Sequence, residues 1–66
     1  MQKLILDDIE IIIYKLFSEG FSIKEIAKKL NFSKRSISLK MKNVSQKINT
    51  NNKIETMCKL IRANII

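Results

Sequence analysis

Residues 22–48 read SIKEIAKKLNFSKRSISLKMKNVSQKI, and this stretch decides the fold. Apolar side chains recur along it at the three- and four-residue spacing of an amphipathic helix, in two separate runs. Only Asn31 and Phe32 separate Leu30, the last apolar residue of the first run, from Ser33, which suits the N-cap of a second helix. The stretch therefore predicts two helices joined by a very short turn, the helix-turn-helix arrangement.

Start and stop signals outside this stretch indicate two further helices. A capping box places a Glu three residues after the N-cap residue, and this spacing occurs at Asp7 with Glu10, Ser22 with Glu25, and Asn52 with Glu55. Gly20 can adopt the positive φ of a residue just past a helix end. No segment shows the sustained alternation of a strand. We expect an all-α, four-helix bundle-like helix-turn-helix domain, one domain over 1–66, with helices over about 8–19, 23–30, 34–48 and 53–64.

The first and the last expected helix each carry an apolar stripe. In helix 8–19 the stripe leaves Ile11 and Tyr14 outside and consists of Ile9, Ile12, Ile13, Leu16 and Phe17. In helix 53–64 it consists of Ile54, Met57, Cys58 and Ile61. We expect Cys58 to be a small buried residue. Ile9 and Ile12 allow two interpretations, core packing or an exposed patch that docks a partner, and core packing is favoured.

Charge is distributed unevenly along the chain. Lys and Arg number 13 against 6 Asp and Glu, a net charge of +7. Residues 1–19 carry a net −2, from 2 basic and 4 acidic side chains, and residues 20–66 a net +9, from 11 basic and 2 acidic ones. Helix 34–48 has no carboxylate beside its five cations, Lys34, Arg35, Lys40, Lys42 and Lys47. Neighbouring cations on a helix repel one another, so a polyanionic partner is favoured over the alternative of a solvated surface.

Several classes of function are excluded by composition. The chain has no His, one Cys and one Gly, so a zinc cluster, a Ser-His-Asp triad and a glycine-rich phosphate loop cannot be assembled. We expect no catalytic residues, no metal and no cofactor. The longest apolar run, 11–14, is far too short to cross a membrane. A small domain without a disulfide framework is typical of the cytoplasm, the location we expect.

The predicted second helix of the pair has the side chains of a DNA-reading helix. Such a helix enters the major groove while the first crosses the backbone, where Lys24 can approach a phosphate. Lys42 can donate to guanine, and Leu39 can contact a thymine methyl group. The outward set of this helix is expected to be Lys34, Arg35, Ser38, Leu39, Lys42 and Ser45.

These residues resemble a known family. SIKEIAKKLNFS at 22–33, followed by Ser36-Ile37 and Lys47-Ile48, is similar to the LuxR-type (GerE-like) helix-turn-helix domain, whose pattern runs S-N-K-E-I-A-x-x-L-x-I-S-x-x-T-V and continues to K-L. The resemblance extends back to Leu6 and Glu10 and forward through Asn52-Lys53 and Glu55. It implies a bacterial transcriptional regulator that binds double-stranded DNA with its third helix and dimerises, with itself or with another regulator, through its fourth.

The resemblance assigns roles to individual residues. It implies base contacts by Ser38, Leu39 and Lys42. It implies phosphate contacts by Lys24, Ser36 and Lys40, to which the charge pattern adds Lys34 and Arg35. It implies dimerisation through Ile54, Met57, Cys58 and Ile61. Ser38 and Lys40 replace the Lys and His usual in the family, so its DNA sequence cannot be transferred.

Two other classes of protein stay open. The chain could be an interaction protein that captures another regulator on a helix-turn-helix scaffold, in which case Ile9 and Ile12 would matter most. It could also be a promoter module like region 4 of a sigma factor, with RNA polymerase as its partner. The apolar fourth helix argues against the second, because such a module has little need of a self-pairing helix.

Overall fold

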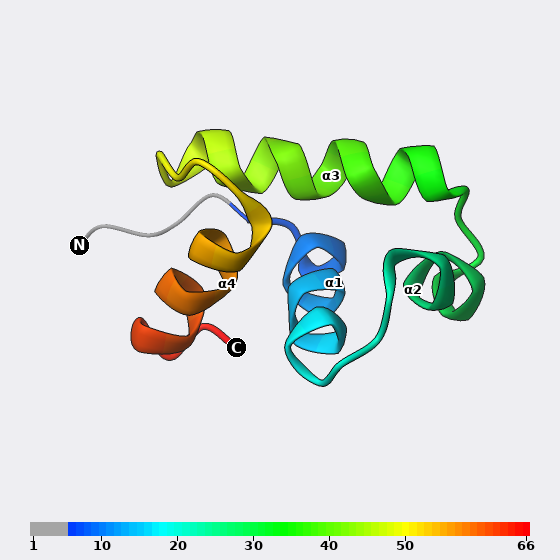
Figure 1. The fold of residues 1–66 in the computed structure, drawn as a ribbon, viewed down its shortest axis with the longest axis horizontal. Coiled ribbons are helices and arrows are strands. Elements are labelled where there is room, and N and C mark those ends of the chain that lie inside the picture. Colours follow the sequence, from blue (N-terminus) through cyan, green and yellow to red (C-terminus); the bar gives the residue numbers. More distant parts are fainter. Residues whose placement is uncertain (1–5) are drawn as a thin grey trace.

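The computed structural model describes residues 6–66, which form four helices and no strand: α1 (Asp8–Ser18), α2 (Ile23–Leu30), α3 (Lys34–Lys47) and α4 (Lys53–Arg62). Helix α3 is the longest and packs against each of the other three, and α1 also contacts α2 and α4. Figure 1 shows α3 lying across one side of the molecule, with α1 between α2 and α4 on the other. None of the described helices is long and apolar enough to span a membrane. The predicted all-α fold is confirmed.

Three helices end one or two residues earlier than predicted. Helix α1 stops at Ser18, and Gly20 adopts a φ of +100°, as expected for a residue just beyond the end. Asn49 after α3 and Asn64 after α4 have φ values of 59° and 60°. Asn tolerates the left-handed region better than other residues with a Cβ, so it ends a helix where no Gly is available. The two Asn residues were stop signals that the apolar periodicity did not reveal.

Side-chain caps explain where the helices begin. At α2, the Ser22 N–H donates to Glu25 Oε1 over 2.8 Å, and the Glu25 N–H donates to Ser22 Oγ over 3.2 Å, which completes the predicted capping box. At α4, Asn52 Oδ1 accepts from the Glu55 N–H at 2.8 Å, but the Glu55 carboxylate accepts from the N–H of Asn51 at 2.7 Å. Asn52 therefore caps α4 as predicted, but Glu55 accepts from the residue before the N-cap and not from the N-cap itself.

The core lies between α3 and the other helices. Its fully or almost fully buried apolar side chains are Ile13, Tyr14, Ile26, Ala27, Ile37, Met41, Val44 and Leu60. The prediction that Tyr14 lies outside the α1 stripe is wrong: its hydroxyl donates to the Met41 carbonyl oxygen at 3.1 Å. Because that bond satisfies its one polar group, the ring can be buried. Ile12 is instead 39% exposed, and Ile9 is partly buried against the core.

An ion pair joins the start of α1 to the end of α3. Lys47 Nζ lies 2.9 Å and 3.2 Å from the two carboxylate oxygens of Glu10, which is almost fully buried. Glu10 also accepts the Asp7 N–H at 2.9 Å, in the N3 position of the α1 cap. The expectation that no carboxylate meets Lys47 is wrong, because the partner lies 37 residues earlier in the chain.

A cluster of hydroxyl groups joins α3 to α4. Thr56 is fully buried, and its Oγ1 lies 2.6 Å from Ser45 Oγ and 2.5 Å from Thr50 Oγ1. Thr56 also donates to the Asn52 carbonyl oxygen at 2.7 Å. Ser45 was expected on the outward face of α3, and the structure places it inside, because this cluster satisfies its hydroxyl.

Candidate nucleic-acid interface

The turn between α2 and α3 is held by backbone and side-chain hydrogen bonds. Asn31 adopts left-handed backbone angles, φ 61° and ψ 43°, and the Phe32 N–H donates to the Ala27 carbonyl oxygen at 2.9 Å. Ser33 Oγ then caps α3 by accepting the Ser36 N–H at 3.1 Å. This turn fixes the direction in which α3 leaves α2 and so orients its outward face.

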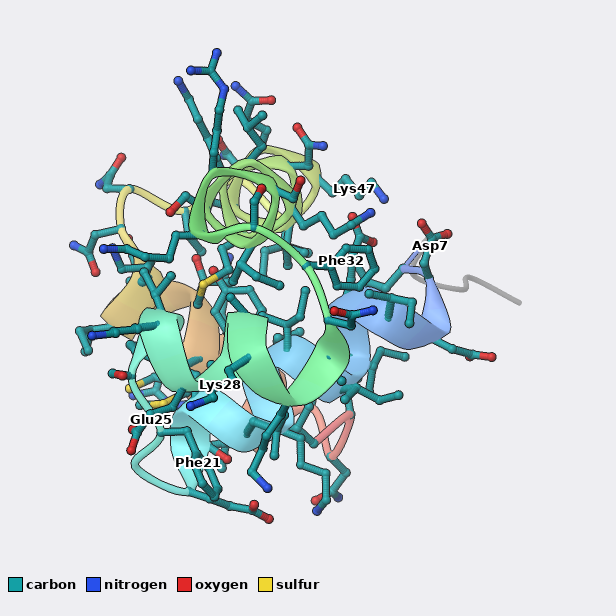
Figure 2. All side chains as sticks on the ribbon, turned by 90° about the vertical axis from the view of Figure 1, so that its right-hand side faces the viewer. Asp7, Phe21, Glu25, Lys28, Phe32 and Lys47 are labelled. Atoms are coloured by element: carbon teal, nitrogen blue, oxygen red, sulfur yellow. The ribbon has the colours of Figure 1, made fainter. Side chains whose placement is uncertain are left out.

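The outward face of α3 is not covered by any other described helix. Figure 2, seen along α3 from its N-terminal end, shows side chains projecting away from the rest of the molecule. Leu39 is 51% exposed although it is apolar. The exposed residues of this face, as expected from the sequence except for Ser45, are Lys34, Arg35, Ser38, Leu39 and Lys42.

Two of the expected phosphate-binding residues of α3 are less exposed than its outward face. Lys40 is partly buried, and its Nζ lies 5.5 Å from the centroid of the exposed Phe32 ring, within cation–π range. Ser36 is partly buried, and its Oγ accepts from Ser33 Oγ at 3.0 Å. Lys24 is exposed in the first turn of α2. The two cations, Lys24 and Lys40, thus lie on α2 and α3, the helices that meet at the turn.

The start of α3 carries charges that oppose its own stability. The first turns of α1, α2 and α4 contain acidic residues, whereas α3 begins with Lys34 and Arg35 and has none. Because the helix N-terminus carries partial positive charge, an exposed cation there costs about 0.3–1 kcal/mol. Within residues 6–66 the ion pairs are Lys15 with Glu19 and Lys47 with Glu10, so the cations of the outward face have no carboxylate partner in that range.

Helix α4 turns an apolar face to solvent. Its buried residues are Thr56 and Leu60, while Ile54 is 58% exposed, Ile61 is 46% exposed and Cys58 is exposed. The expectation that Cys58 is buried is wrong, because Thr56 and Leu60 occupy the inward positions of α4 and Cys58 lies on its exposed side. We call Ile54, Cys58 and Ile61 the outer α4 stripe; Met57 lies beside it, partly buried.

A hollow opens beside α3, where the chain passes into α4. It has a volume of about 320 Å³ and is lined by Ser38, Lys42, Ser45, Asn51, Asn52 and Lys53. The sequence predicted Ser38 and Lys42 as base contacts and Asn52 as a helix cap, but it gave Lys53 no role in binding. The signal that Lys53 offered was a cation at the first position of a predicted helix. No group of three or more potential metal ligands occurs among residues 6–66.

Comparison with known proteins agrees with this geometry. A family model described as bacterial regulatory proteins, luxR family, matches residues 5–60, from just before α1 to Leu60 in α4. The match covers most of the chain and includes the whole of the α2–turn–α3 unit. A search of curated proteins found no match.

Proposed function

We propose that this chain, which belongs to the luxR family of bacterial regulatory proteins, recognises a specific sequence of double-stranded DNA with helix α3. The domain is of the helix-turn-helix type found in DNA-binding transcription regulators, a regulatory rather than an enzymatic family. The observation that supports the proposal best is the outward face of α3, which is basic, uncovered and unpaired with carboxylates within residues 6–66. Double-stranded DNA, a dense polyanion, would neutralise that face.

The exposed residues divide by the chemistry they offer to DNA. An α-helix fits the major groove, where Lys42 would donate to guanine O6 and N7, Leu39 would contact a thymine methyl group, and the small Ser38 would allow close approach. Lys and Ser side chains that reach phosphates set the register but read no sequence. That role is proposed for Lys24, Lys34, Arg35, Ser36 and Lys40.

We further propose that the protein acts as a dimer paired through the outer α4 stripe, with Met57 at its border. Burying Ile54 and Ile61 against a second copy would remove apolar surface from water. A two-fold pair would set two α3 helices about 34–36 Å apart, one turn of DNA, on a quasi-palindromic site. The proposed location is the cytoplasm, on the nucleoid.

Selection of bound duplexes from a random pool at about 0.15 M salt tests this function, because attraction by charge alone is weakened at that salt concentration. We expect enrichment of two related half-sites at a fixed spacing. Recovery of no common sequence would overturn base-specific recognition. Recovery of a single half-site would overturn dimeric binding alone.

Variants of the protein separate reading from pairing. We expect Lys42→Ala to change the selected sequence as well as the affinity, whereas Lys29→Ala should change neither, since Lys29 lies over Phe21, which Figure 2 shows on the side of the molecule away from α3. Ile61→Lys should keep the half-site and lose the fixed spacing. Circular dichroism of Ile61→Lys should show an unchanged fold, because Ile61 is 46% exposed and lies outside the core.

A further inference from the structure

The hollow beside α3 is lined mainly by residues whose side chains can donate hydrogen bonds to an anion. Two of its six lining residues are Lys42 and Lys53, none is acidic, and the others carry hydroxyl or amide groups. Within residues 6–66 neither lysine forms an ion pair. Ser45 is tied to Thr56 and forms part of the lining that joins α3 to α4. The hollow is thus basic, and the hydrogen bond between Ser45 and the buried Thr56 holds one of its walls in place.

The amide of Asn52 has a defined orientation at the edge of this hollow. Its Oδ1 accepts the Glu55 N–H at 2.8 Å, so the remaining polar group of the side chain is its NH₂, a donor. The nearest acidic residue in the sequence, Glu55, does not line the hollow, and its Oε1 accepts the Asn51 N–H at 2.7 Å. The lining therefore offers ammonium and amide donors to an incoming group.

Lys53 is placed where its charge does not serve the helix. It is exposed and is the first residue of α4, where the partial positive charge of the helix N-terminus disfavours a cation. Its position resembles that of Lys34 and Arg35 at the start of α3, which flank the same outward face. An anion bound between Lys42 and Lys53 would be attracted by both ammonium groups, and its charge would offset the unfavourable cation at the start of α4.

The hollow also lies on the opposite flank of α3 from the cation already described. Figure 2 shows the segment that joins α3 to α4 on one side of α3 and Phe32, over which Lys40 lies, on the other. A helix in the major groove runs between two phosphate strands. A basic group on each flank would therefore face each strand.

We propose that the hollow lined by Lys42, Asn52 and Lys53 is a binding site for a phosphate group, and that the DNA backbone supplies this phosphate. The inference rests on the proposed DNA binding and extends it to the α3–α4 connection. It also gives Lys42 two neighbours in the complex, a base edge in the groove and a phosphate at its rim.

The test is the salt dependence of duplex binding by the whole chain and by Lys53→Gln, with Lys29→Gln as a control that removes the same charge on the side of the molecule away from α3. Each phosphate contact contributes about 0.9 to the slope of log K against log salt. We expect Lys53→Gln to lower the slope by about 0.9 and to weaken binding roughly five-fold at 0.15 M salt, equally for selected and unrelated duplexes. Lys29→Gln should leave the slope unchanged.

A second arm distinguishes the DNA backbone from a free phosphorylated ligand. Inorganic phosphate is titrated at constant ionic strength while the backbone amide signals of residues 38–53 are followed by NMR. Saturable shifts that Lys53→Gln abolishes, together with an unchanged DNA slope, would overturn the assignment to the DNA backbone. No change in either arm would overturn the phosphate site altogether. If the unmodified chain binds no duplex, the proposed function fails instead, and the two failures are thereby distinguished.

Discussion

Helices α1 and α3 begin with opposite charges, and the difference separates residues that serve the fold from residues that serve a partner. The first turn of α1 holds Asp8 and Glu10, which suit the helix dipole, and Glu10 also binds Lys47. The first turn of α3 holds Lys34 and Arg35, with no acidic residue. The start of α1 thus stabilises the isolated domain, whereas the start of α3 becomes favourable only beside an anion.

Loss of the Glu10 carboxylate should have the largest effect on stability. Glu10→Ala would leave the Lys47 ammonium group without its partner and remove a helix cap. Breaking a buried ion pair from one side costs about 3–5 kcal/mol, and because Lys47 keeps some contact with water we expect about 3 kcal/mol in urea unfolding. The control is Glu19→Ala, which removes an exposed pair at 3.9 Å and should cost under about 0.5 kcal/mol. Equal losses in both variants would contradict the role of Glu10.

Neutralising the start of α3 should separate stability from binding. We expect Lys34→Gln with Arg35→Gln to weaken duplex binding roughly 30-fold at 0.15 M salt, since two phosphate contacts are lost. The free energy of unfolding, measured by thermal denaturation, should rise by up to about 1 kcal/mol, because the helix dipole no longer opposes cationic side chains at the start of α3.

The matched control acts at the start of α1. Asp8→Asn should lower stability by about 0.5 kcal/mol and leave duplex affinity unchanged. If the α3 double variant lost stability while keeping its DNA affinity, the contrast between the two helix starts would be wrong.

Tyr14 extends the structural role of α1 to the middle of α3. Tyr14→Phe removes the hydrogen bond to the Met41 carbonyl oxygen and should cost about 1 kcal/mol in urea unfolding. Burial raises the pKa of Tyr14 above its ordinary 10.0, although the nearby hydroxyl groups of Ser45 and Thr56 act the other way. The folded state therefore keeps this proton more tightly than the unfolded state. The resulting stability is complete below pH 10 and is lost as the pH rises through the raised pKa.

Comparison of alkaline unfolding isolates this effect from the titration of lysines. The difference in stability between the unmodified chain and Tyr14→Phe should narrow as the pH rises above 10.0. A constant difference across that range would show that the phenol keeps its ordinary pKa in the fold.

The capping box of α2 should give the smallest effect. The pKa of Glu25 lies below its ordinary 4.5, first because the Ser22 N–H donates to the carboxylate, then through the Ser22 side chain and the charge of Lys29. A lowered pKa adds stability that is present above pH 4.5 and is lost as the pH falls through the folded value. Acid titration of Glu25→Gln, followed by circular dichroism, should therefore show a shallower loss below pH 4.5 than the unmodified chain. An identical acid profile would contradict the carboxylate's part in the cap.

The outward side chains of the candidate interface could largely be predicted from the sequence. Ser38, Leu39 and Lys42 are exposed as expected, because the inward seam of Ile37, Met41 and Val44 leaves them on the other side of α3. Their contacts with DNA stay predictions. Lys53 could not be found in the same way, because its place beside Lys42 depends on how the α3–α4 connection folds back.

The sequence by itself determined the four helices and their order. Ser22, Ser33 and Asn52 cap helices through bonds to residues three positions away, and Gly20 ends α1 through its own backbone freedom. Interactions of this range depend only on neighbours in the chain. For that reason the helix starts were right and the ends differed by at most two residues.

Only the tertiary structure decided which face of each outer helix turns inward. The apolar stripes of α1 and α4 predicted Tyr14 outside and Cys58 inside, and both were wrong. Burial of Tyr14 depends on a carbonyl group 27 residues away, and burial of Thr56 on a hydroxyl group of Ser45, 11 residues away. A polar side chain enters a core where a distant partner satisfies its hydrogen bonds, and local periodicity carries no record of that partner.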